Sequence, residues 1–317
     1  MSSTEPQPGD TPTLDTAPTQ DRAPVEREFT VAERSQARQI LRRFMHHKLA
    51  VASAIVLILL FLLAFVGGHF WKYNYQKFTN DFSQSPSWNH PFGTDSNGVD
   101  TFAAVMRGTQ RSLEIALFVA IVSTVIGTVY GAVAGFYRGR VDGILMRVVD
   151  LFLTFPIIAI AAVLGDKYGT KAQGWLFIAI IIAGLTWPYV SRIMRGVVLS
   201  LREKEFIEAA RALGASDRRI IFRHLFPNAA GPIIVTVTVL VATAILTETA
   251  LSFIGFGVQF PDTSLGLLVT NAQTAVDTRP WLFYFPGLFI ILIALSINFI
   301  GDGLRDAFDP AQTRVRS

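Results

Sequence analysis

Residues 199–227 read LSLREKEFIEAARALGASDRRIIFRHLFP, a strongly charged segment between two uncharged stretches, 172–191 and 228–247. Each uncharged stretch has the roughly 20 residues that an α-helix needs to cross the ~30 Å hydrocarbon core of a bilayer. The charged segment has apolar residues at helical spacing. The sequence therefore predicts a polar helical element that lies between two membrane spans.

Apolar stretches of spanning length recur along the chain. They also cover 49–68, 115–137 and 280–301, and a weaker sixth stretch, 151–165, contains Pro156. The composition agrees, because 51% of the 317 residues are hydrophobic, 16% are charged and the mean hydropathy is +0.41. We predict an all-α integral membrane protein with about six transmembrane helices. The weakest of them is expected to be short, tilted or kinked.

The basic residues are distributed unequally between the two sides of these predicted spans. If the N-terminal segment, the loops 138–147 and 192–227 and the tail share one side, that side carries 21 of the 28 Lys and Arg residues. The positive-inside rule makes this side cytoplasmic, so both termini are predicted to be cytoplasmic. Segment 192–227 stays on this side even if the third and fourth spans form a re-entrant pair.

The predicted organisation follows from these spans and from the composition between them. In chain order it has a disordered cytoplasmic leader 1–30, a basic juxtamembrane helix 31–48, span 49–68, an external segment 69–111, span 112–137, a cytoplasmic loop 138–147, spans 148–165 and 172–191, the cytoplasmic segment 192–227, span 228–254, an external loop 255–279, span 280–301 and a cytoplasmic tail 302–317. The leader is rich in Pro, Thr, Ser, Asp and Gln and poor in large apolar residues, which is typical of disorder.

The first half of segment 192–227 predicts a helix with a low, polar face. Glu205 and Glu208 come early in it and Arg211 comes late, which matches the helix dipole. Ala209 and Ala210 have short side chains, so that a groove on another protein can approach the backbone on their side of the helix. The alternative is an amphipathic loop that rests on lipid headgroups, since the segment has eight Lys and Arg against four Asp and Glu. Composition alone leaves both interpretations open.

The second half predicts a turn and another helix. Gly214 suits a left-handed stop, because glycine adopts positive φ without steric cost. Ser216 or Asp217 can cap the helix that follows, and Pro227 is expected to end it.

Residues 208–227 resemble the EAA loop, which marks the permease subunits of ATP-binding-cassette importers. Other stretches are similar to the peptide and nickel permeases, and within them to the C-type component of dipeptide and oligopeptide importers. These are HPFGTDSNGVD at 90–100, Arg111-Ser-Leu113, the block 135–156, LSFIGFG at 251–257 and NFIGDGLRDAFDP at 298–310. The similarity extends over about residues 30–312. The family usually has Arg at Val99 and Trp at Leu265, two departures in predicted external segments that bear on partner and cargo.

The resemblance implies a type I ABC-importer permease fold in a prokaryotic cell membrane, with no catalytic activity in this chain. The implied partners are a paralogous permease subunit, two ATPase subunits, an extracellular or periplasmic substrate-binding protein, a peptide substrate and membrane lipid. No nucleic acid partner is expected. ATP and Mg are expected on the ATPases and no cofactor on this chain, which lacks the Gly-x-x-x-x-Gly-Lys-Ser/Thr phosphate loop. Nickel or another small solute is the alternative cargo.

The resemblance also assigns roles to individual residues. ATPase contacts are expected along the EAA loop, at Glu205, Glu208, Ala209, Ala210, Arg211, Gly214, Asp217 and Pro227. Contacts to the substrate-binding protein are expected at Asp95 and Asp100. No metal site is expected, because the run 95–100 departs from a calcium loop at its fifth and sixth positions and no histidine or carboxylate cluster has ligand spacing.

Two features inside the spans bear on function. Glu248 is the one acid well inside an otherwise apolar span, so it is a candidate for the translocation pathway, with a structural hydrogen-bonding role as the equal alternative. Gly127, Gly131 and Gly135 form a stripe that predicts close approach of another helix, preferably within the chain and otherwise in another subunit. With Glu248 almost alone, an ion-coupled secondary transporter is disfavoured. A membrane-anchored scaffold would need the basic loop but would not be sensitive to substitution of Gly214.

Overall fold

The computed structural model describes residues 36–168 and 174–308. Within these ranges every regular element is helical, apart from one isolated bridge between Thr94 and Asp100. The predicted all-α class is therefore confirmed. The predicted leader 1–30 lies outside the described residues, as do the first residues of the predicted helix 31–48 and the end of the tail.

The helices follow one another with few long connections. The first half contains α1 (Gln36–His46), α2 (Lys48–Leu62), the π-helical η1 (Leu63–Gly67), α3 (Gly68–Phe70), α4 (Thr101–Tyr137), α5 (Gly139–Thr154) and α6 (Ile157–Tyr168). The second half contains α7 (Gly174–Arg202), α8 (Glu205–Ala212), α9 (Asp217–Arg219), the π-helical η2 (Ile220–Leu225), α10 (Phe226–Asn228), α11 (Ala230–Phe253), α12 (Leu265–Ala272), the 3₁₀ turn η3 (Gln273–Ala275) and α13 (Trp281–Phe308).

Five helical segments of the described chain are long and apolar enough to cross a membrane. They are Lys48–Phe70, Thr101–Tyr137, Gly174–Arg202, Ala230–Phe253 and Trp281–Phe308. A sixth candidate is the pair Gly139–Thr154 and Ile157–Gly165, which is bent by 70°. The bend falls at Pro156, and Phe155 before it has the extended conformation (φ −79°, ψ 136°) that a following proline favours.

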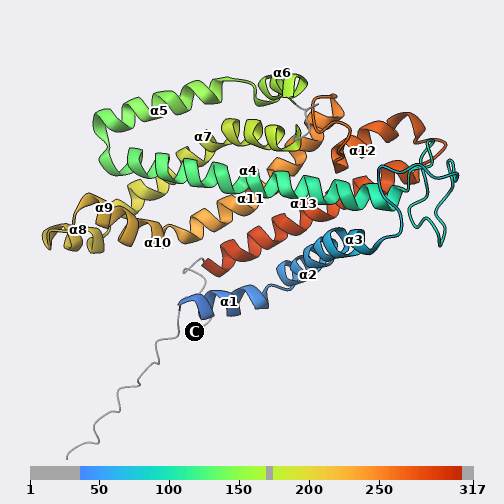
Figure 1. The fold of residues 1–317 in the computed structure, drawn as a ribbon. Coiled ribbons are helices and arrows are strands. Elements are labelled where there is room, and N and C mark those ends of the chain that lie inside the picture. The colour runs from blue at the N-terminus through green and yellow to red at the C-terminus, as the bar shows by residue number, and fades with distance from the viewer. Residues whose placement is uncertain (1–35, 169–173, 309–317) are drawn as a thin grey trace, which may run out of the picture. The chain divides into compact units, whose positions relative to one another are not determined.

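The short elements gather at the two ends of the helical bundle. Figure 1 shows α8, α9 and α10 at one end, and α12 with the loop between α3 and α4 at the other. We call these the α8 end and the α12 end. The helix α1 lies near the C-terminal end of α13, where Arg43 Nη1 donates to the carbonyl oxygen of Ala307 at 3.5 Å and His47 lies 3.7 Å from Asp306.

The glycine stripe of α4 packs against α7. A Cβ atom at Gly127 would lie 2.5 Å from Val190 Cβ, and one at Gly135 would lie 2.9 Å from the carbonyl oxygen of Arg195. Between them, a Cβ at Gly131 would overlap the carbonyl oxygen of Ser191. Such close backbone contact requires glycine, and it is a main source of helix association in lipid. The stripe therefore serves packing within the chain.

Candidate functional site

The EAA segment, residues 205–228, lies at the α8 end. Its first helix begins after Lys204, which has an extended backbone, and carries Glu205 and Glu208 in the first turn and Arg211 in the last. These charges complement the helix dipole. Both glutamates and Arg211 are exposed, so their side chains are available to a partner.

The helix α8 ends in a Schellman motif. The amide of Gly214 donates to the carbonyl of Arg211 at 2.9 Å, and the amide of Ala215 donates to the carbonyl of Ala210 at 3.0 Å. Gly214 has φ +76°, the left-handed conformation that the sequence predicts for it. A Cβ atom there would meet no other atom within 4 Å, so backbone conformation rather than space requires glycine.

A small hydrophobic core fixes the EAA segment to the ends of α4 and α7. It consists of Ala132 and Phe136 from α4, Val198 from α7, and Ile207, Ala210, Ile220, Ile221 and Leu225 from the segment. Arg202 on α7 donates to the carbonyl oxygen of Phe136, and the guanidinium groups of Arg202 and Arg211 lie 5.7 and 5.5 Å from the Phe136 ring centroid. These contacts anchor the segment to two of the candidate membrane spans.

Two sequence expectations for this segment need correction. Ala209 is exposed, but Ala210 is only 8% exposed and belongs to the small core, so the two alanines do not share one outward face. Pro227 does not end a helix. It lies in the first turn of α10, where a missing N–H is tolerated. The preceding turn η2 is π-helical, and α11 follows only one residue after α10.

The outer surface of the segment combines charged groups of both signs with apolar groups. Leu213 is 88% exposed, Phe222 58% and Phe206 39%. A hollow of about 360 Å³ is lined by Phe222 together with Ser216, Arg218 and Arg219. Asp217 is exposed nearby, in the first turn of α9. The exposure of Leu213 was not predicted from the sequence. Its position just before Gly214 is the signal that could have shown it, because a residue at the end of a helix can turn away from the apolar face.

Glu248 lies in the opposite half of the bundle, buried between three elements. Its Oε1 accepts from Ser252 Oγ at 2.7 Å, and its Oε2 accepts from Ser112 Oγ on α4 at 3.3 Å. Ser112 also accepts from the amide of Leu265 at 3.2 Å, and Ser264 Oγ lies 3.4 Å from Ser252 Oγ. The carboxyl group therefore joins α4, α11 and the start of α12. Its side chain is fully buried, and these contacts within the chain favour the structural interpretation.

Two arginines of α4 hold the loop before α12. Arg107 Nε donates to Asp262 Oδ1 at 2.9 Å, and Arg111 forms a second ion pair with Asp262. Arg111 also pairs with Glu114, and its guanidinium lies 4.7 Å from the Trp175 ring centroid. These charges belong to the α12 end of α4, upstream of the uncharged stretch 115–137.

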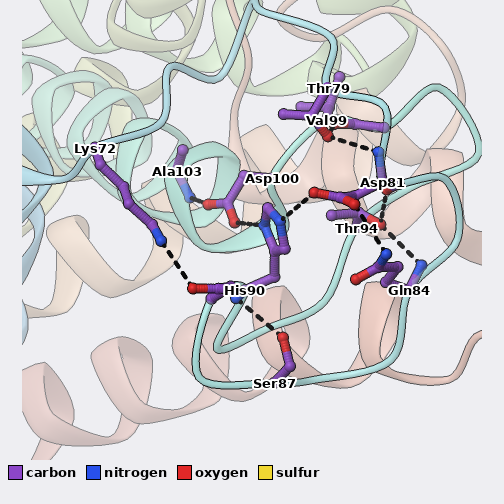
Figure 2. Close-up of polar contacts among 12 residues, drawn as sticks. Lys72, Thr79, Asp81, Gln84, Ser87, His90, Thr94, Val99, Asp100 and Ala103 are labelled. Carbon is purple, nitrogen blue, oxygen red and sulfur yellow. Dashed lines mark hydrogen bonds and ion pairs between the residues drawn. The ribbon is translucent and has the colours of Figure 1, made fainter.

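Asp100 is buried beneath the surface of the α12 end. Figure 2 shows His90 between Asp81 and Asp100. His90 Nδ1 lies 2.7 Å from Asp100 Oδ2, and Nε2 lies 3.2 Å from Asp81 Oδ2. Asp100 also accepts from Trp71 Nε1 at 2.9 Å and, as the N-cap of α4, from the amide of Ala103 at 2.7 Å. With 0% exposure, it shapes this loop instead of presenting a contact to a partner.

Asp95 lies beside an outward cavity of about 580 Å³. Its Oδ1 accepts from the amides of Asn97 and Val99 at 2.8 and 2.7 Å, which fixes the turn. The cavity is lined by the loop before α4, by the 260–263 loop and by α12, and Phe78 and Phe260 at its lining are 71% and 79% exposed. Among the described residues, no group of three His, Cys, Asp or Glu can hold a metal ion.

Two family models match the chain. Residues 127–314 match the inner membrane component of binding-protein-dependent transport systems, and residues 35–91 match the N-terminal TM domain of oligopeptide transport permease C.

Curated relatives match over nearly their whole length. The oligopeptide transport system permease protein OppC of Mycobacterium tuberculosis (strain ATCC 25618 / H37Rv) is 41% identical over 278 residues, which cover 87% of this chain and 95% of the relative. OppC of Escherichia coli (strain K12) is 41% identical over 285 residues, covering 88% and 93%. The dipeptide transport system permease protein DppC of Alkalihalophilus pseudofirmus is 37% identical over 289 residues, covering 90% and 93%.

The fold has a solved counterpart. The chain is similar to a chain of the MetNI methionine ABC transporter in an inward-facing conformation, with a TM-score of 0.54 and 18% identity. The match covers 65% of this chain and 96% of that chain. At this identity the likeness shows the fold alone.

Proposed function

The chain belongs to the family of inner membrane components of binding-protein-dependent transport systems, and on that premise we propose that it is the C-type permease subunit of an ATP-driven peptide importer. The observation that carries the proposal is the match to oligopeptide and dipeptide permeases at 37–41% identity over 87–90% of the chain. Oligopeptides are the preferred cargo and dipeptides the second candidate. No observation favours nickel or an ion-coupled mechanism.

The EAA segment is the proposed site of ATPase docking. Its outer surface carries Glu205, Glu208 and Ala209 beside the exposed apolar side chains of Leu213 and Phe222. Apolar groups surrounded by charges suit a protein groove, in which the apolar contacts supply affinity and the charges fix register. ATP and Mg are bound by the partner ATPases. This chain transmits their movement through the small core to α4 and α7.

The translocation pathway is proposed to form between this chain and a paralogous permease. Large apolar side chains on α4, among them Ile121 and Val125, are exposed in the isolated chain. In a membrane they face lipid or the second permease. Each ATPase of the pair then contacts one EAA segment.

The cavity beside Asp95 is the proposed docking surface for the substrate-binding protein. The α12 end carries few basic residues, so the positive-inside rule makes it external and both termini cytoplasmic. Exposed Phe78 and Phe260 give this surface the aromatic groups that anchor protein interfaces. Val99, where the family usually has Arg, lines the same cavity. This residue is therefore proposed to influence which substrate-binding protein docks.

Uptake measurements test the proposed function. Cells that lack this chain should lose uptake of labelled tri- to pentapeptides and regain it with the wild-type gene. The tagged chain should also co-purify with two ATPase subunits and a second permease. Normal peptide uptake in the deletion strain, or purification of an active chain without ATPases, would contradict the proposal.

A further inference from the structure

A cavity of about 380 Å³ opens where the first membrane span ends. The span closes at Phe70, whose side chain is 80% exposed, and the chain leaves it extended at Trp71 (φ −69°, ψ 138°). Trp71, Tyr73 and Tyr75 then line the cavity. Tryptophan and tyrosine gather at the boundary between membrane and water. The cavity is thus at the depth of lipid headgroups, in the leaflet at the α12 end.

The charged lining of this cavity is basic. It contains His69, Lys72, Lys77 and Arg107, and no aspartate or glutamate of the described chain lines it. The ammonium group of Lys72 contacts uncharged groups, with its Nζ 3.2 Å from Asn89 Oδ1 and 4.7 Å from the Tyr73 ring centroid. Arg107 is paired with Asp262. The excess positive charge therefore comes mainly from Lys72 and Lys77.

A turn brings the two lysines to the same cavity. The amide of Gln76 donates to Asn74 Oδ1 at 2.9 Å, and the amide of Lys77 donates to the carbonyl of Asn74 at 3.1 Å. This Asx turn reverses the chain after Tyr73. Both lysines are exposed and line the cavity, so their ammonium groups can reach an anion there.

The helix that leads to the cavity exposes an apolar side. Ile58, Leu62, Val66 and Phe70 recur at four-residue intervals and are 57%, 47%, 48% and 80% exposed. In a bilayer, these side chains contact acyl chains. A lipid that lies along this side has its headgroup at the level of Lys72 and Lys77.

We propose that this basic interfacial cavity, lined by residues from 65–77 and 103–110, binds the phosphate group of an anionic phospholipid in the leaflet at the α12 end. The ammonium groups of Lys72 and Lys77 hold the phosphate as point charges. The aromatic rings pack against the glycerol region. Bound lipid links the end of the first span to α4, independently of the cargo.

The test uses the full chain purified with its accompanying subunits in neutral detergent. Phosphatidylglycerol and phosphatidylcholine are added in turn, and native mass spectrometry measures the lipid retained. Lys72→Gln with Lys77→Gln should weaken phosphatidylglycerol binding roughly 10–30-fold, since each charge near a membrane surface contributes about fivefold. Lys72→Arg with Lys77→Arg should keep binding close to wild type, which separates loss of charge from misfolding.

A matched control removes the same charge at the other end of the bundle. Lys48→Gln with Arg140→Gln changes two exposed basic residues and should leave binding at this cavity unchanged. Equal retention of the two lipids, or unchanged binding in the Lys72 and Lys77 double variant, would overturn the proposal. Displacement of the lipid by inorganic phosphate at equal concentration would assign the site to free phosphate instead. Loss of substrate-binding-protein affinity without loss of lipid would assign it to protein docking.

Discussion

At Gly214, backbone conformation limits which residue is accepted. The residue has φ +76° and open space around it, so a side chain would not collide with a neighbour. It would instead strain the turn by about 1–2 kcal/mol, the cost of a left-handed conformation for a residue with a Cβ. This strain falls on the connection between α8 and η2, both of which are proposed to contact the ATPase.

We predict that Gly214→Asp abolishes peptide uptake and peptide-stimulated ATPase activity while the chain still inserts at normal level. Gly196→Ala is the matched control, because Gly196 is helical, has φ below zero and has open space at its Cβ position. That variant should transport normally. Membrane-fraction blots and uptake assays measure both. Wild-type transport by a stably inserted Gly214→Asp variant would argue against the coupling role.

Glu248 yields a second prediction at this scale. Glu248→Gln keeps one acceptor oxygen and replaces the other with an NH₂ group, which can donate to the hydroxyl of Ser112 or Ser252. The variant should therefore assemble nearly as well as wild type. Glu248→Ala removes the acceptor to which these two buried hydroxyls donate, which costs about 1–3 kcal/mol. It should lower the thermal stability of the purified complex. Changed peptide preference in a fully assembled Glu248→Gln variant would support a pathway role instead.

For single residues, the sequence predicts backbone conformation but not which side chains face outward. The turn at Gly214 depends on its own backbone, so it is readable from the chain alone. Whether Ala209 or Ala210 faces outward depends on contacts with α4 and α7, which come from distant parts of the sequence. The burial of Asp100 likewise depends on Trp71 and His90.

Among the elements, α4 and α7 pack so closely that several positions of α4 accept only glycine. At Gly131 a Cβ atom would lie 2.9 Å from the amide nitrogen of Arg195 and 3.0 Å from Met194 Cβ. At the same end, Arg195 also forms a two-bond ion pair with Asp142 on α5, with both distances 2.5 Å. Three helices are thus fixed together next to the EAA segment.

We predict that Gly131→Val separates α4 from α7 and lowers the amount of folded complex, because overpacking costs about 1–3 kcal/mol. Gly184→Val on α7 is the control, since a Cβ atom there meets nothing within 4 Å. Fluorescence-detected size-exclusion chromatography of tagged variants measures the folded fraction. Equal folded fractions for the two variants would contradict the packing role of the stripe.

Spans were predictable because a bilayer demands long apolar stretches, and the six stretches found in the sequence correspond to the five spans and the bent pair. The effect of proline was predictable only in part. Pro156 breaks a helix, whereas Pro227 sits after a π-helical turn that already lacks the usual hydrogen-bond pattern. Local sequence does not predict a π-helical turn, so the position of Pro227 after one is known only from the structure.

For the whole molecule, the proposed function requires the α8 end and the α12 end to lie on opposite sides of the membrane. The chain has no cysteine, so a single introduced cysteine reports its own position. We predict that Asn97→Cys reacts with a membrane-impermeant maleimide in intact cells, and that Leu213→Cys reacts only after permeabilisation. Both side chains are exposed. Labelling of Leu213→Cys in intact cells would invert the proposed orientation.

We propose that peptide crosses the membrane only when partner ATPases act on the EAA segment of this chain. The direct measurement is ATP-dependent uptake of labelled peptide into proteoliposomes, with a substrate-binding protein present. We predict no accumulation with the chain alone, accumulation against a gradient with the whole complex, and loss of that accumulation when Leu213→Glu and Phe222→Glu are combined. Uphill accumulation by the chain alone, or full activity of the double variant in an intact complex, would contradict the claim.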